Sequence, residues 1–194
     1  MIICITGMPG SGKSVTADIL GKMGFKIIEM GDLIREEMKR NGIKVTNENM
    51  RNFAIDIRKR GGNDIVAKLT AKKIKNLRNR GKIAIVGVRN ADELSYFRRI
   101  FKRFATVEIY APAKSRYERL EGRGRKDDPK NYNEFKFREK KEGKLGIASA
   151  IMSTDYVVLN TGSIADLKKS LKLLVGFLEE KEGNAKRKKS VPGA

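Results

Sequence analysis

The segment that most constrains this chain is a glycine-rich stretch that follows an apolar run and precedes a helical pattern. It satisfies the pattern G-x-x-x-x-G-K-[ST] of a phosphate-binding P-loop. In such a loop, glycines let successive backbone N–H groups point at phosphate oxygens, and the following helix adds its positive N-terminal end. We therefore predict an ATP site formed by Gly7, Met8, Pro9, Gly10, Ser11, Gly12, Lys13, Ser14 and Val15.

Two side chains of this loop carry the chemistry. Lys13 is expected to contact the β- and γ-phosphates and to act in catalysis, and Ser14 is expected to offer its hydroxyl to Mg²⁺. Mg²⁺ bound with ATP is accordingly the expected cofactor. A turn without a nucleotide is the alternative, and the strand before the loop and the helix after it argue against that alternative.

Short apolar runs alternate with amphipathic helical stretches along the chain, which is typical of a parallel sheet with helices on both faces. The runs are rich in Ile and Val, as strands buried on both faces should be. We expect five strands, at residues 1–6, 25–30, 83–88, 105–110 and 156–159. The sequence therefore predicts an α/β fold in three layers.

Two stretches interrupt this alternation. Residues 31–80 hold three helical patterns between the second and third strands, and residues 121–143 are polar, charged and punctuated by glycine. We interpret the first as a helical insertion that binds the acceptor and the second as a short lid, within one domain over residues 1–182. Residues 183–194 are basic with nothing to bury, so we expect them to be disordered.

The charge balance favours an anionic partner. Lys and Arg number 43 and Asp and Glu number 23, which leaves a net charge of +20. The chain has no histidine, which excludes Ser-His-Asp hydrolases and zinc sites that need imidazole. The only cysteine, Cys4, lies in an apolar run and is expected in the core. No stretch approaches the roughly 18 apolar residues of a membrane span, and we expect a cytoplasmic protein.

Two arginines follow neighbouring expected strands. Arg35 ends the segment Gly-Asp-Leu-Ile-Arg after the second strand, and Arg89 ends Gly-Val-Arg after the third. Ligands bind at the carboxyl ends of strands in open α/β sheets. Two guanidinium groups converging there suit the phosphate of a monophosphate acceptor, because arginine offers paired donors and stays charged. Two unrelated surface arginines are the alternative.

A third group of arginines lies further along the chain. Arg116, Arg119 and Arg123 fall at i, i+3 and i+7 on one predicted helix face, and Arg138 follows on the next helical stretch. Closing a lid over the site would bring such cations onto a transferring phosphoryl group. In so basic a chain, a merely solvated face is the alternative.

Together these motifs resemble the P-loop nucleoside-monophosphate kinases, and most closely an archaeal group of adenylate kinase-related proteins that also look like dephospho-coenzyme A kinase. The resemblance covers nearly the whole chain up to residue 181 and implies the strand order 2-3-1-4-5. It implies that Asp32, Arg35 and Arg89 bind the acceptor, and that the loop containing Asn160 and Gly162 cradles the adenine of ATP. It also implies that the catalytic lid arginines are Arg119, Arg123 and Arg138.

The implied activity is transfer of the γ-phosphoryl group of ATP to a nucleoside monophosphate, with AMP as the first candidate acceptor and dephospho-coenzyme A as the second. An alternative from another functional class is a protein that binds a nucleotide at this site without transferring a phosphoryl group. That reading is a catalytically weak regulatory protein, or one associated with nucleic acid, to which the basic tail could add weak contact.

One position departs from the family pattern. Such proteins usually carry Asp or Glu directly before the glycine of the strand-three motif, whereas this chain has Val86 before Gly87. An apolar side chain cannot hold a metal-bound water, so the departure bears on Mg²⁺ binding and on turnover. Asp32, where the family also has an acid, is the expected substitute, acting on the metal through a water.

Overall fold

The computed structural model describes residues 1–78, 81–124, 128–144 and 146–190. A five-stranded sheet lies at its centre in the order β2-β3-β1-β4-β5, and every neighbouring pair is parallel. This confirms the predicted topology. The strands are β1 (Ile2–Thr6), β2 (Phe25–Glu29), β3 (Lys82–Val86), β4 (Phe104–Tyr110) and β5 (Tyr156–Leu159).

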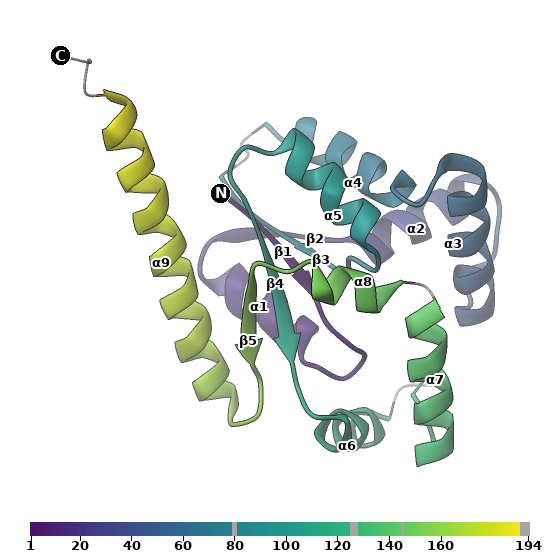
Figure 1. Ribbon diagram of the computed structural model, residues 1–194. Helices are drawn as coiled ribbons and strands as arrows, with labels where there is room; N and C mark the ends of the chain where they lie inside the picture. The colour runs from purple at the N-terminus through teal and green to yellow at the C-terminus, as the bar shows by residue number, and fades with distance from the viewer. Residues whose placement is uncertain (79–80, 125–127, 145, 191–194) are drawn as a thin grey trace.

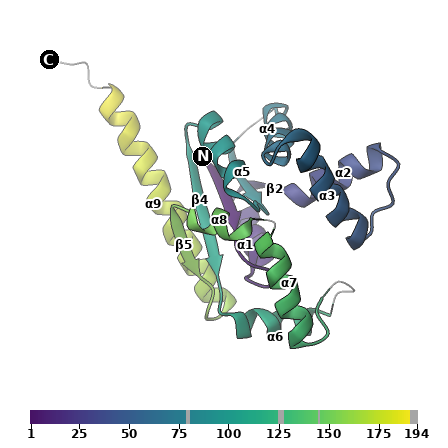
Figure 2. The ribbon, with the colours of Figure 1, turned by 45° about the vertical axis from the view of Figure 1, so that its right-hand side comes forward.

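Helices cover both faces of the sheet, as the three-layer prediction requires (Figure 1). The connections up to β4 contain α1 (Lys13–Lys22), α2 (Met30–Arg40), α3 (Asn47–Gly61), α4 (Ile65–Lys75) and α5 (Ala91–Ile100). The rest of the chain adds α6 (Ala113–Arg123), α7 (Tyr132–Lys144), α8 (Ile147–Met152) and α9 (Ile164–Ser190). Figure 2 shows α2 and α3 on one side of the sheet, with α6 and α7 as a separate group.

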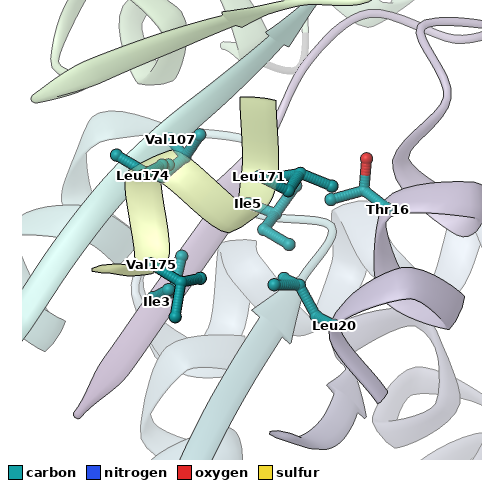
Figure 3. A pocket seen from close by; sticks show the side chains of 8 residues that line it. All are labelled: Ile3, Ile5, Thr16, Leu20, Val107, Leu171, Leu174 and Val175. Carbon is teal, nitrogen blue, oxygen red and sulfur yellow. The ribbon is translucent and has the colours of Figure 1, made fainter. Parts of the chain in front are cut away.

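The face under α1 and α9 forms one half of the core. Ile3, Ile5 and Val107 of the sheet pack against Leu20 of α1 and Leu171 of α9 (Figure 3). The leucines of α9 recur at helical spacing, so one stripe of the helix meets the sheet. The opposite face buries Cys4 against residues of α2 to α5, which confirms the predicted core position, and this burial raises the pKa of the thiol.

Local signals for helix ends are confirmed in the insertion and after β3. The Thr46 hydroxyl accepts a hydrogen bond from the Asn49 N–H at 3.1 Å and caps α3. The side-chain oxygen of Asn90 accepts a hydrogen bond from the Glu93 N–H at 2.9 Å and caps α5. These caps satisfy N–H groups that have no partner within the helix. The three helices between β2 and β3 are those predicted for residues 31–80.

Disorder from residue 183 stays a prediction, and the structure gives helix in part of this segment. Helix α9 continues to Ser190, and its C-terminal part projects beyond the sheet in both views (Figures 1 and 2). Ala, Lys and Arg favour helix without a buried face, so a helix anchored by its first turns can continue into solvent. Residues 191–194 lie outside the described residues. No helix among those described is long and apolar enough to cross a membrane.

The packing of α9 yields a stability prediction with a matched control. Leu171 is 2% exposed and Leu173 is 67% exposed on the same helix. We expect Leu171→Ala to lower the free energy of unfolding by about 2–5 kcal/mol, because it leaves a cavity against β1. Leu173→Ala should change the free energy of unfolding by no more than about 0.5 kcal/mol. Urea unfolding measures both, and equal losses would contradict this account of how α9 packs.

Candidate nucleotide-binding site

The loop after β1 has the backbone that its glycines predict. Gly10 has a φ of 79° and Gly12 a φ of 103°, both in the left-handed region that side chains rarely adopt. A Cβ on Gly10 would lie 2.6 Å from the Arg116 carbonyl oxygen, and one on Gly12 would collide with the Asn160 amide. The loop therefore needs glycine for its conformation and for the close approach of α6 and of the β5 end.

Lys13 begins α1 and turns back over the loop. Its Nζ donates to the Gly7 carbonyl at 2.6 Å and to the Met8 carbonyl at 3.0 Å. Burial of the ammonium group, reinforced by the charge of Arg89, lowers the pKa of Lys13 from 10.5 to about 8. Glu142 opposes the shift. Because burial disfavours the charged form of Lys13, an anion bound beside it would stabilise that charge.

Asn160 joins the loop to the end of β5. Its Nδ2 donates to the Ser11 carbonyl at 2.8 Å, and this bond is buried. The backbone carbonyl of Asn160 accepts a hydrogen bond from Arg119 Nη2 at 2.8 Å. Arg119 Nη1 is buried and has no hydrogen-bond partner among the described residues. The structure thus brings Arg119, Asn160 and Gly162 to the P-loop side of one cleft.

Arg116 serves as an anchor. It is buried and its Nε donates to the Ala111 carbonyl at 2.9 Å, while its Nη1 donates to the Pro9 carbonyl at 3.4 Å. The same Nη1 forms an ion pair with Glu139 of α7. The predicted all-arginine face of α6 is therefore not uniform. Its first member is structural, and the next two line the cleft.

The other two lid arginines meet at one carboxylate. Arg123 donates from its Nε to Asp128 Oδ2 at 2.8 Å, and Arg138 Nη1 lies 3.4 Å from Asp128 Oδ1. Asp128 is buried. The three side chains join the end of α6 to α7 and line the cleft. Residues 125–127 of the predicted lid lie outside the described residues.

The acceptor-side arginines also open onto this cleft, but Asp32 does not. Arg35 and Arg89 line it, and Arg89 Nη1 lies 3.7 Å from Glu142 Oε2. Asp32 is not among the described residues that line the cleft, and its Oδ1 lies 2.9 Å from Arg35 Nη2 on the same helix. The roles predicted for Asp32 in acceptor and metal binding stay predictions, and its carboxylate pairs here with Arg35, which lines the cleft. Residues i and i+3 of one helix pair locally.

Sequence reasoning missed a buried carboxylate that supports Arg89. Glu93 accepts from Arg58 Nη2 at 2.7 Å and from the Arg89 backbone N–H at 2.9 Å. Burial raises the pKa of Glu93, and Arg58 opposes that shift. The capping-box spacing of Asn90 and Glu93 marked this residue only as part of a helix start. Its partner on α3 is 35 residues away, beyond any local pattern.

The cleft that these residues share has a volume of about 2110 Å³. Sites for single small molecules measure roughly 300–1,000 Å³, so the cleft has room for a donor and an acceptor together. The P-loop lies at one end, and Met50, Arg51 and Arg58 of α3 lie at the other. Among the described residues, no group of three or more His, Cys, Asp or Glu side chains could hold a metal ion by itself.

The relatives of this chain share nearly its whole length. It matches a family model described as an AAA domain over residues 6–136. It is 40% identical over 178 residues to a UPF0200 protein of Pyrococcus abyssi, covering 90% of this chain and 95% of the relative. A UPF0200 protein of Thermococcus gammatolerans is 38% identical, with coverage of 90% and 94%. The chain belongs to the UPF0200 protein family.

Solved structures place this UPF0200 member among the P-loop kinase folds. TT1252 from Thermus thermophilus is 24% identical, has a TM-score of 0.58 and covers 92% of this chain and 97% of its own. A shikimate kinase from Aquifex aeolicus has a TM-score of 0.53 at 19% identity, with coverage of 95% and 98%. A gluconokinase from Sinorhizobium meliloti has a TM-score of 0.54 at 16% identity, with coverage of 92% and 95%. These structures confirm the predicted fold.

The shifted pKa of Lys13 gives a pH prediction. Its folded-state pKa of about 8 lies below the unfolded value of 10.5, so the unfolded chain binds more protons between these pH values. The free energy of unfolding therefore gains a favourable contribution as pH rises from 8 towards 10.5. We expect Lys13→Met to lose that contribution and Lys22→Met, an exposed position on the same helix, to keep it. Urea unfolding at pH 7.5 and 9.5 tests this, and identical pH dependence in all three proteins would contradict it.

Proposed function

We propose that this protein is a cytoplasmic kinase that transfers the γ-phosphoryl group of ATP to a nucleoside monophosphate, with AMP as the first candidate acceptor. The observation that carries the proposal is one cleft lined at one end by the P-loop and further along by Arg35 and Arg89. The kinase-like fold and family support a phosphotransferase in general. The choice of a nucleoside monophosphate as acceptor goes beyond what fold and family support.

At the donor end, residues 7–15 would hold the triphosphate of ATP, with backbone N–H groups directed at its oxygens. Lys13 would exchange its bonds to two loop carbonyls for the β- and γ-phosphates. The cation that burial makes costly in the free protein would then face two anions. Asn160 and Gly162 would contact the adenine through their backbone, since Asn160 already fixes the loop through Ser11.

At the acceptor end, Arg35 and Arg89 would bind the monophosphate. Glu93 sets the position of Arg89 through the backbone N–H, which leaves the guanidinium group to the acceptor and to Glu142. An acceptor oxygen would then attack the γ-phosphorus in line as the bond to the ADP oxygen breaks. Arg119, Arg123 and Arg138 would stabilise the charge on the transferring group.

Mg²⁺ bound to the phosphates would neutralise developing negative charge. The Ser14 hydroxyl at the start of α1 fits this ion, because Mg²⁺ prefers oxygen ligands and keeps several waters when it binds with phosphates.

The acceptor assignment predicts a separation of effects between two ligands. We expect Arg35→Ala and Arg89→Ala each to weaken AMP binding by about 1.5–3 kcal/mol, the contribution of a charged hydrogen bond, which is roughly ten- to hundredfold in affinity. ATP affinity should stay near that of the native protein. Calorimetry with each ligand measures both, and Lys168→Ala, an exposed lysine of α9, serves as the control. Equal loss of both ligands would contradict the assignment.

The choice of acceptor and the alternative function are tested together. We expect native protein to transfer phosphate from ATP to AMP and Lys13→Ala to lose this activity, measured as ADP release. A panel of AMP, dephospho-coenzyme A, shikimate and gluconate identifies the acceptor. ATP binding without transfer to any of them would favour the regulatory reading, which Val86 and the net charge of +20 support.

A further inference from the structure

The residue at the end of β3 lies on the α1 side of the sheet. Val86 belongs to the core cluster that includes Ala17 and Leu20 of α1. It also lines the cleft beside the P-loop residues Lys13 and Ser14. An acid in this position would face the start of α1, and valine leaves that face of β3 without one.

Glu29 lies next to this position on the neighbouring strand. It is the last residue of β2 and pairs in parallel register with Val86. Side chains in register on neighbouring strands share a face of the sheet, and the strands are about 4.8 Å apart. Every second residue of a strand points to the same face of the sheet. Phe25 belongs to the core on the α1 side, and Ile27 packs against it. Glu29 continues their period of two and so directs its carboxylate to the α1 side.

The height of Glu29 along α1 follows from the packing of the two elements. A Cβ on Gly21 would lie 3.7 Å from Ile27 Cγ1, so these residues are level. Helix α1 runs antiparallel to β2, because it connects parallel strands. Two residues further along β2 advance roughly 6.6 Å, somewhat more than one 5.4 Å turn of helix. Glu29 is therefore level with the middle of α1, about one turn from Ser14, and it lines the same cleft.

The carboxylate of Glu29 is half-buried and is not used by the fold. Glu29 is the N-cap residue of α2, yet its side chain caps no backbone N–H group of that helix. The side chain has no hydrogen bond or ion pair with the described residues. Asp32, by contrast, forms an ion pair with Arg35 of the same helix. Of these two acids, only Glu29 is among the described residues that line the cleft with the P-loop.

We propose that Glu29 supplies the carboxylate that β3 lacks, and that it holds a water of the Mg²⁺ bound to the nucleotide phosphates. This inference rests on the proposed function, because the metal arrives with ATP. The donor set fits the ion. The Ser14 hydroxyl and the Glu29 carboxylate are hard oxygen groups on one face of the cleft, and Mg²⁺ retains waters that a nearby carboxylate can orient. Glutamate, longer than aspartate, suits the position one strand further from the loop.

Mn²⁺ serves as the probe, because its electron paramagnetic resonance signal separates free from bound ion without turnover. The titration uses full-length protein with a non-hydrolysable ATP analogue. We expect Glu29→Gln to weaken Mn²⁺ binding by the ternary complex about tenfold or more, as loss of a carboxylate that orients metal ligands does. The control is Glu36→Gln, an exposed acid of α2 that pairs with Lys73, which should leave Mn²⁺ affinity unchanged.

A second variant separates a metal role from a folding defect. Adding Val86→Asp to Glu29→Gln moves the carboxylate one strand closer to the loop, and it should recover most of the lost Mn²⁺ affinity. Affinity for the analogue in EDTA tests the proposed function by itself. If the analogue does not bind native protein, the nucleotide site and this inference both fail. If the analogue binds and Glu29→Gln keeps native Mn²⁺ affinity, the inference is overturned while the nucleotide site stands.

Discussion

The site depends on the close packing of backbone around the loop that leaves the central strand. Three segments distant in sequence meet there: the P-loop, the start of α6 and the end of β5. Asn160 bonds to Ser11 and Arg116 bonds to Pro9, so side chains from both neighbours hold loop carbonyls. Because the approaches leave no space for a Cβ at Gly10 or Gly12, the observed conformation of the loop depends on glycine at both positions.

Positive charge in the cleft is organised by carboxylates. Asp128 joins Arg123 and Arg138, Glu93 positions Arg58 and the loop of Arg89, and Glu139 holds Arg116. A buried ion pair contributes little net stability, because desolvation offsets the attraction, but loss of one partner leaves a costly unpaired charge. These acids therefore fix the positions of the arginines more than they strengthen the fold. The net charge of +20 says nothing of this arrangement.

The sequence was sufficient for features that depend on local pattern. Strand positions follow from apolar runs, the caps at Thr46 and Asn90 from spacing, and the P-loop from its glycines. The strand order came from resemblance, since spacing alone does not order a sheet. Features that depend on the register between strands were out of reach. Asp32 and Glu29 are three residues apart, and only the strand register places Glu29 beside Val86. No apolar stripe in the sequence marks the continuation of α9 to Ser190, since helix propensity needs none.

Helix α7 holds two acids that pair with opposite sides of the cleft. Glu139 forms an ion pair with Arg116, which is fixed to the P-loop, and Glu142 lies 3.7 Å from Arg89 beside β3. The donor loop and the acceptor loop are thus in electrostatic contact through one rigid element. An anion that draws Arg89 away from Glu142 changes the field around Lys13, whose pKa Glu142 helps to set. If the two ends bind donor and acceptor as proposed, occupancy of either end would alter the affinity of the other, because coupling between two ligands is reciprocal in free energy.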